Sequence, residues 1–156
     1  MVFAQSVAQL RRKAKPMPRV SKKPGVPLEE DEAVAFAAWL RAQHIPHTHI
    51  ANEIGGSTRT VKARAMKAKK MGQSAGTWDY DIYVPVYDIN GEIGAYQEIR
   101  IELKRIKGST TSPAQKAWGK IYEMAGIPCA VCKGAEKAID FVRQIQAEIN
   151  GEGYDY

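Results

Sequence analysis

The sequence has 156 residues, of which 44% are hydrophobic, and this is enough for one domain with a buried core. Lysine and arginine number 23 against 17 aspartates and glutamates, a formal charge of +6 at pH 7 that favours polyanionic partners such as nucleic acid. No apolar run approaches the ~18 residues that span a bilayer, and no signal peptide is visible, so the sequence argues against a membrane protein and predicts an intracellular one.

Residues 1–27 predict a flexible basic arm, because they carry seven basic residues, four prolines and no acidic residue. A domain is predicted at residues 28–150. It should open with a helix in "LEEDEAVAFAAWLRAQ", where Pro27 precedes a run of acids and then good helix formers. This helix should end before Pro46.

The next segment, "HIPHTHIANEIGG", predicts a loop or a short helix, and its three histidines are predicted to hold no metal because no cysteine or paired acid accompanies them. A very basic helix, "TRTVKARAMKAKKM", should follow and end at Gly72. Segment 48–70 also resembles a helix-turn-helix in which Arg59, Lys62 and Arg64 would grip DNA. A DNA-binding protein without catalytic activity is therefore the alternative interpretation.

From Thr77 onward, aromatic and β-branched residues predict a β-hairpin, "TWDYDIYVPVYD" and "AYQEIRIELKRI", joined by the turn "NGEIG". "SPAQKAWGKIYEMAG" predicts a helix with one apolar stripe of Ala117, Ile121 and Met124. A short strand, "IPCAVCK", should bury its two cysteines, and "GAEKAIDFVRQIQAEIN" should form a last amphipathic helix. This order of elements predicts an α/β sandwich with a mixed sheet.

Strand alternation places Glu102 and Lys104 on one face of the second hairpin strand, opposite the apolar Ile99, Ile101 and Leu103. An aspartate of the preceding strand, in "GTWDYDIYVP", can lie beside Glu102. Two such carboxylates repel each other unless a cation lies between them, and their hard oxygens suit Mg²⁺ or Mn²⁺. A metal there could activate water, with Lys104 orienting the nucleophile.

The order "GTWD", "IELK", "SPAQKAW" and "AGIPCAVCKG" resembles the VRR-NUC domain, the virus-type replication and repair nuclease branch of the PD-(D/E)XK superfamily. The resemblance covers roughly residues 28–145. It implies a restriction-endonuclease-like sandwich, with a central mixed sheet flanked by helices. One departure is visible, because Trp78 stands where the family has proline.

The resemblance implies a catalytic set of Asp79, Glu102, Lys104 and Gln115. It also implies Mg²⁺ or Mn²⁺ bound by Asp79, Glu102 and the carbonyl of Leu103. Spacing alone does not separate Asp79 from Asp81, which lies two residues further along the same strand face. We choose Asp79 because the Gly-x-x-Asp pattern puts it at the start of the strand.

The family also uses a glutamate on the first helix. At 100° per residue, Glu29 falls in the middle of the apolar stripe, between Phe36 and Leu40 in projection, so it should have a buried partner. Glu32, at the edge of the stripe, is the second choice.

By the same resemblance, the protein would be a structure-selective endonuclease for branched DNA such as Holliday junctions. It would act as a homodimer in DNA repair, in a bacterial cytoplasm or a phage-infected host. The residues expected to bind DNA are basic: Arg59, Lys62, Arg64, Lys67 and Lys107. The sequence leaves open whether the substrate is a four-way junction, a flap or plain duplex.

Overall fold

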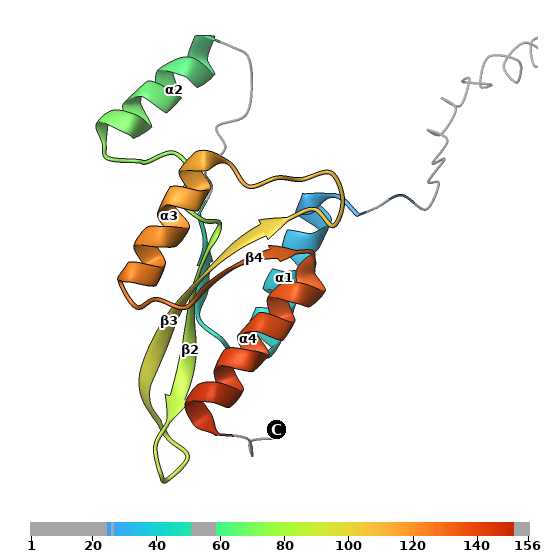
Figure 1. The fold of residues 1–156 in the computed structure, drawn as a ribbon, viewed down its shortest axis with the longest axis vertical. Coiled ribbons are helices and arrows are strands. Elements are labelled where there is room, and N and C mark those ends of the chain that lie inside the picture. The colour runs from blue at the N-terminus through green and yellow to red at the C-terminus, as the bar shows by residue number, and fades with distance from the viewer. Residues whose placement is uncertain (1–24, 26, 51–58, 152–156) are drawn as a thin grey trace, which may run out of the picture.

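The computed structural model describes residue 25 and residues 27–50 and 59–151 (Figure 1). Most of the predicted basic arm, 1–27, lies outside the described residues. The helices in the described part are α1 (Glu29–Ala42), α2 (Arg59–Lys70), α3 (Pro113–Met124) and α4 (Ala135–Asn150), and the strands are β1 (His47–His49), β2 (Tyr80–Tyr87), β3 (Ile93–Lys104) and β4 (Cys129–Lys133). None of these helices combines the length and the apolar character needed to cross a membrane.

Within the described residues, the strands form one four-stranded sheet in the order β1-β2-β3-β4. The β1–β2 and β2–β3 pairs are antiparallel and the β3–β4 pair is parallel, so the sheet is mixed. Helices α1 and α4 cover one face and α3 lies on the other, while α2 stands outside this sandwich (Figure 1). The predicted α/β sandwich with a central mixed sheet is therefore confirmed.

The core lies between the sheet and helices α1 and α4, and strand alternation builds it. It contains apolar side chains from every one of these elements, among them Phe36, Leu40, Ile82, Val84, Ile99, Ile101, Leu103, Val142 and Ile145. Cys132 belongs to this core and Cys129 is half-buried, so the two cysteines serve largely as the small packing residues that the sequence predicts. The opposite sheet face is free to carry the polar side chains of β2 and β3.

Strand β1 differs from the prediction of a loop or short helix. His47 pairs with Ile82 and His49 with Tyr80, and the N–H of Tyr83 donates to the carbonyl of Pro46 at 2.9 Å. The edge of β2 thus recruits a segment too short to show a period of its own. The helix-turn-helix alternative loses the first residues of its first helix to this strand, and residues 51–58 lie outside the described residues.

Helix α3 turns a different face inward from the one predicted. The stripe of Ala117, Ile121 and Met124 faces solvent, with Met124 89% exposed, whereas Gly119 and Tyr122 are buried. The reason is the partner across the interface, since the indole of Trp78 takes the place on which the helix packs. The prediction that this stripe faces the core is wrong.

Candidate active site

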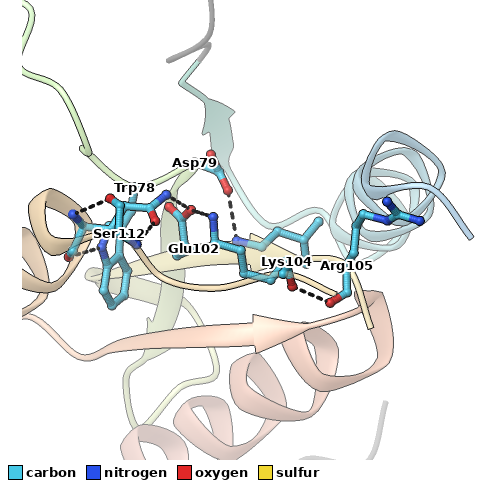
Figure 2. Close-up of polar contacts among 9 residues, drawn as sticks. Trp78, Asp79, Glu102, Lys104, Arg105 and Ser112 are labelled. Carbon is cyan, nitrogen blue, oxygen red and sulfur yellow. Dashed lines mark hydrogen bonds and ion pairs between the residues drawn. The ribbon is translucent and has the colours of Figure 1, made fainter. Parts of the chain in front are cut away.

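The predicted site residues of the hairpin meet at the end of the sheet where β2 begins and β3 ends. Tyr80 pairs with Ile101, so one further step along the register sets Asp79 opposite Glu102. Both line a pocket of about 690 Å³, together with Leu103, Lys104 and Gln115. Figure 2 shows Asp79, Glu102 and Lys104 gathered at this position.

Asp79 is fixed at both ends of the residue. Its carboxylate Oδ2 accepts the N–H of Leu103 at 3.0 Å, and its own carbonyl accepts the N–H of Ile50 at 2.7 Å. Burial raises the pKa of Asp79, while the Leu103 N–H and the positive charge of Lys104 oppose that rise. The aspartate is therefore held rigidly in an environment that disfavours its negative charge.

Asp81 occupies a different environment. Its carboxylate forms an ion pair with Arg100, which lies directly across in β3, and the same guanidinium contacts Glu98 at 2.6 Å. Asp81 is not among the residues that line the pocket. The geometry thus separates two aspartates that the sequence spacing leaves equivalent, and Asp79 is the one that faces Glu102.

Glu102 is 1% exposed, and its two carboxylate oxygens are treated unequally. Oε1 accepts from Lys104 Nζ at 2.7 Å and from the side-chain amide of Gln115. Oε2 is buried and has no hydrogen-bond partner among the described residues. Burial, reinforced by Asp79, raises the pKa of Glu102 to about 7 despite the opposing bond from Lys104. A buried carboxylate oxygen without a donor is costly and calls for a ligand.

Lys104 is held beside both carboxylates. Burial disfavours its charged form, but the hydrogen bond and charge of Glu102, with smaller contributions from Glu29 and Asp79, outweigh burial and raise the pKa of Lys104. The ammonium group therefore stays protonated at neutral pH and is available to a negatively charged substrate.

The backbone of Leu103 faces the same corner. In β3, the N–H of Arg100 and the carbonyl of Lys104 bond to the β4 chain, to Pro128 and Gly134. Backbone direction alternates along a strand, so Leu103 turns its N–H and carbonyl toward the β2 side, where the N–H meets Asp79. The carbonyl is accordingly on the side of the aspartate.

Gln115 reaches Glu102 from the first turn of α3. Ser112 caps this helix, because its hydroxyl accepts the N–H of Gln115 at 3.2 Å while the Gln115 Oε1 accepts the N–H of Ser112 at 2.9 Å. This reciprocal bond fixes the amide with its NH₂ group toward Glu102. A residue that would otherwise read as a surface glutamine is thereby part of the site.

The two first-helix glutamates are placed differently from the expectation. Glu29 lines the pocket but is exposed, so it lacks the buried partner that helix projection predicts. Glu32 is the buried carboxylate, and its Oε2 accepts the N–H of Ala135 at 2.6 Å, at the start of α4. The structure thus uses Glu32 to join α1 to α4 and leaves Glu29 as the first-helix acid at the pocket.

The donor set suits a hard divalent cation, within limits. Among the described residues, no group of three or more His, Cys, Asp or Glu side chains is arranged to hold a metal ion. Two facing carboxylates, one with a partnerless buried oxygen, nevertheless match Mg²⁺, which binds through one or two carboxylates and fills its remaining positions with water and substrate oxygens. These residues therefore fit such an ion.

The predicted DNA-binding residues lie outside the pocket. Lys62, Arg64 and Lys67 are exposed on α2, and Lys107 is exposed in the loop between β3 and α3. Arg59 begins α2, and its side chain lies outside what the structure describes.

Sequence reasoning missed His49 and Ser112, both of which line the pocket. The ring of His49 lies 4.9 Å from that of Tyr80, and its charge lowers the otherwise raised pKa of Asp79. The signal for His49 was strand β1, which is too short to recognise. The Ser-Pro-x-Gln pattern at residues 112–115 was the available signal for a capping box.

Comparisons with known proteins bear on the fold. No protein-family model matches the sequence, and no curated protein does. A solved structure described as a "VRR_NUC domain protein" matches with a TM-score of 0.58 at 24% sequence identity, over 83% of this chain and 93% of its own. The chain has the VRR_NUC fold. At this identity the likeness establishes the fold alone, so the activity has to be argued from the site.

Proposed function

We propose that the protein is a nuclease that hydrolyses DNA phosphodiester bonds with Mg²⁺ or Mn²⁺. The observation that carries the proposal is Glu102, a fully buried carboxylate with one partnerless oxygen, opposite Asp79 and in contact with Lys104. The pocket around these groups is large enough for a phosphodiester group. The shared VRR_NUC fold supports the same activity.

In this proposal Asp79, Glu102 and the Leu103 carbonyl hold the cation. When bound, it would supply two kinds of chemistry: it would lower the pKa of a water molecule and withdraw negative charge from the phosphate. Hard oxygen ligands suit both Mg²⁺ and Mn²⁺.

The other polar groups of the pocket would position the reactants. Lys104, protonated at neutral pH, would hydrogen-bond to the attacking water or to a phosphate oxygen. Gln115 holds Oε1 of Glu102, which leaves Oε2 to serve as the ligand. Glu29, at the mouth of the pocket, would complete the acidic cluster through water.

The basic residues would bind the DNA backbone. Helix α2 has no acid in its first turn and ends in three lysines, and it carries its charges outside the sandwich (Figure 1). Side chains that contact phosphates fix the position of DNA without reading its sequence. Binding through Arg59, Lys62, Arg64, Lys67 and Lys107 would therefore be strongly salt-dependent and nearly independent of sequence.

Branched DNA and a homodimer belong to the same proposal, since a two-fold symmetric junction requires two active sites. The solvent-facing stripe of Ala117, Ile121 and Met124 on α3 is a surface suited to a second copy. On one flank it carries Lys120 and Glu123, which would meet each other across an antiparallel pair of α3 helices. Ile121→Lys should convert a dimer to a monomer by light scattering, and a wild-type monomer would contradict this part. A junction-cutting enzyme would act in DNA repair, in a bacterial or phage-infected cytoplasm.

The test of the proposed function is cleavage of a labelled four-way junction, a flap and a matched linear duplex, each with Mg²⁺, Mn²⁺ or EDTA. We expect metal-dependent cutting, strongest on the junction, and none in EDTA. Cutting that persists in excess EDTA would remove the metal from the account, and tight DNA binding without cutting in either metal would leave a binding protein.

A further inference from the structure

We propose that Trp78 is a positioning residue that holds the first turn of α3 at a fixed distance from the start of β2, and so aims the Gln115 amide at Glu102. The inference rests on the proposed function, in which Glu102 acts. It concerns the position at which this chain departs from the proline of the family that it resembles.

Hydrogen bonds connect Trp78 to the site through a single residue. The indole N–H donates to the backbone carbonyl of Gln115 at 2.9 Å, and the side-chain amide of that same glutamine donates to Glu102 (Figure 2). Trp78 also immediately precedes Asp79 in the chain. One side chain therefore joins the residue beside the aspartate to the residue that orients the glutamate.

Packing leaves α3 no room to approach more closely. A Cβ added at Gly119 would lie 2.9 Å from Cζ2 of Trp78, and one added at Gly76 would lie 2.6 Å from Ala114 Cβ and 2.8 Å from the backbone nitrogen of Gln115. Gly76 also has a φ of +80°, which disfavours any other residue. Glycines thus allow contact at two points, and the indole sets the separation between them.

The same indole is anchored on its other side. Trp78 is 4% exposed and meets the ring of Tyr122 edge-on at 5.5 Å. Tyr122 in turn lies under the guanidinium of Arg100, which pairs with Asp81. The indole is therefore held between α3 and the polar face of the sheet, and it cannot shift independently of the active-site strands.

Trp78→Phe keeps an aromatic ring but removes the N–H and part of the contact with Gly119. The carbonyl of Gln115 would lose its donor and the first turn of α3 would move, so the amide would no longer meet Glu102 correctly. A displacement of about 1 Å near a reacting group can cost on the order of 100-fold in rate. We expect kcat to fall by roughly 10- to 100-fold with KM nearly unchanged, because phosphate binding uses other residues.

The test is a double-mutant cycle on Trp78→Phe and Gln115→Ala, measured as cleavage rate under saturating DNA. If Trp78 acts through Gln115, Trp78→Phe should slow the wild type yet add little to Gln115→Ala. Trp118→Phe is the matched control, because Trp118 stacks on the same Tyr122 ring from within α3. It should leave kcat within about twofold, since its removal frees no group that contacts Glu102.

A second readout needs neither metal nor cleavage. In ¹⁵N NMR spectra of the metal-free protein, the side-chain amide of Gln115, assigned by its absence in Gln115→Ala, should be displaced from free amides. Trp78→Phe should return it toward them, whereas Trp118→Phe should not. Gly119→Ala is the reserve variant if Trp78→Phe does not fold, because its methyl group would press on Trp78 and should shift the same amide resonance.

Additive effects of Trp78→Phe and Gln115→Ala, or an unmoved Gln115 amide in Trp78→Phe, would overturn the proposal and leave Trp78 as a core residue. If the wild type cuts no DNA in any metal, the proposed function fails instead. The NMR comparison then decides the positioning role by itself.

Discussion

Replacing Glu102 with glutamine should make the metal-free protein more stable toward neutral pH, relative to wild type. The structure raises the pKa of this carboxyl from 4.5 to about 7, chiefly because the group is buried. Ionisation therefore costs free energy in the folded state, and a difference of ~2.5 pKa units corresponds to about 3 kcal/mol. Glutamine keeps the shape of the side chain and does not ionise.

The sign follows from proton binding. Between pH 4.5 and about 7 the folded wild type binds more protons at Glu102 than the unfolded chain does, so its stability falls as pH rises. Glu102→Gln lacks this dependence. The free energy of unfolding of the variant minus that of wild type should therefore rise by about 3 kcal/mol between about pH 4.5 and pH 8.

The assay is urea unfolding in EDTA at four or five pH values, with equal m-values as the condition for comparison. Loss of the Lys104 partnership shifts the difference between the two proteins at every pH but leaves its trend. Glu30→Gln, an exposed glutamate on the pocket wall, controls for the loss of one negative charge. A difference between Glu102→Gln and wild type that stays flat, or that falls with pH, would refute the reasoning.

Three further outcomes are expected. Mg²⁺ or Mn²⁺ at about 100 times its Kd should stabilise the protein by about 2.7 kcal/mol; in calorimetry this gain should vanish in Asp79→Asn and survive in Asp81→Asn, and the reverse result would exchange the two aspartates. Glu32→Ala should cost about 1–3 kcal/mol of unfolding free energy, because it leaves the buried N–H of Ala135 without an acceptor; an exposed match, Glu30→Ala, should cost little, and equal losses would mean that the bond does not matter. Replacing the exposed basic side chains of α2 by alanine should flatten the salt dependence of DNA affinity by ~0.9 log unit per lost phosphate contact, and an unchanged slope would place the DNA elsewhere; the residues are Lys62, Arg64 and Lys67.

The hairpin could be predicted because its signals are local. Alternation along β2 and β3 survives into the structure since one face is buried, and a turn with Gly91 at a φ of +77° sets the register. That register alone brings Asp79 opposite Glu102. The centre of the candidate site was therefore accessible from the sequence.

The surrounding residues depend on partners distant in the sequence. Helix projection ranks Glu29 above Glu32, but the N–H that receives Glu32 belongs to a residue 103 positions later. Strand β1 exists because β2 offers an open edge, and His49 reaches the pocket only through it. The inward face of α3 is chosen by Trp78 across the interface, which the apolar pattern of the helix does not contain.

The most direct test of the central claim is single-turnover cleavage of a four-way junction with Mn²⁺ by wild type, Lys104→Ala and Lys133→Ala, with DNA affinity measured alongside. Lys133 pairs directly with Lys104 in the sheet and is exposed, so it is a matched control for the loss of a lysine. We predict metal-dependent cutting by wild type and Lys133→Ala, and a loss of at least ~100-fold in Lys104→Ala with DNA affinity little changed. Equal cutting by all three proteins would contradict the assignment of the active site to the corner formed by Asp79, Glu102 and Lys104.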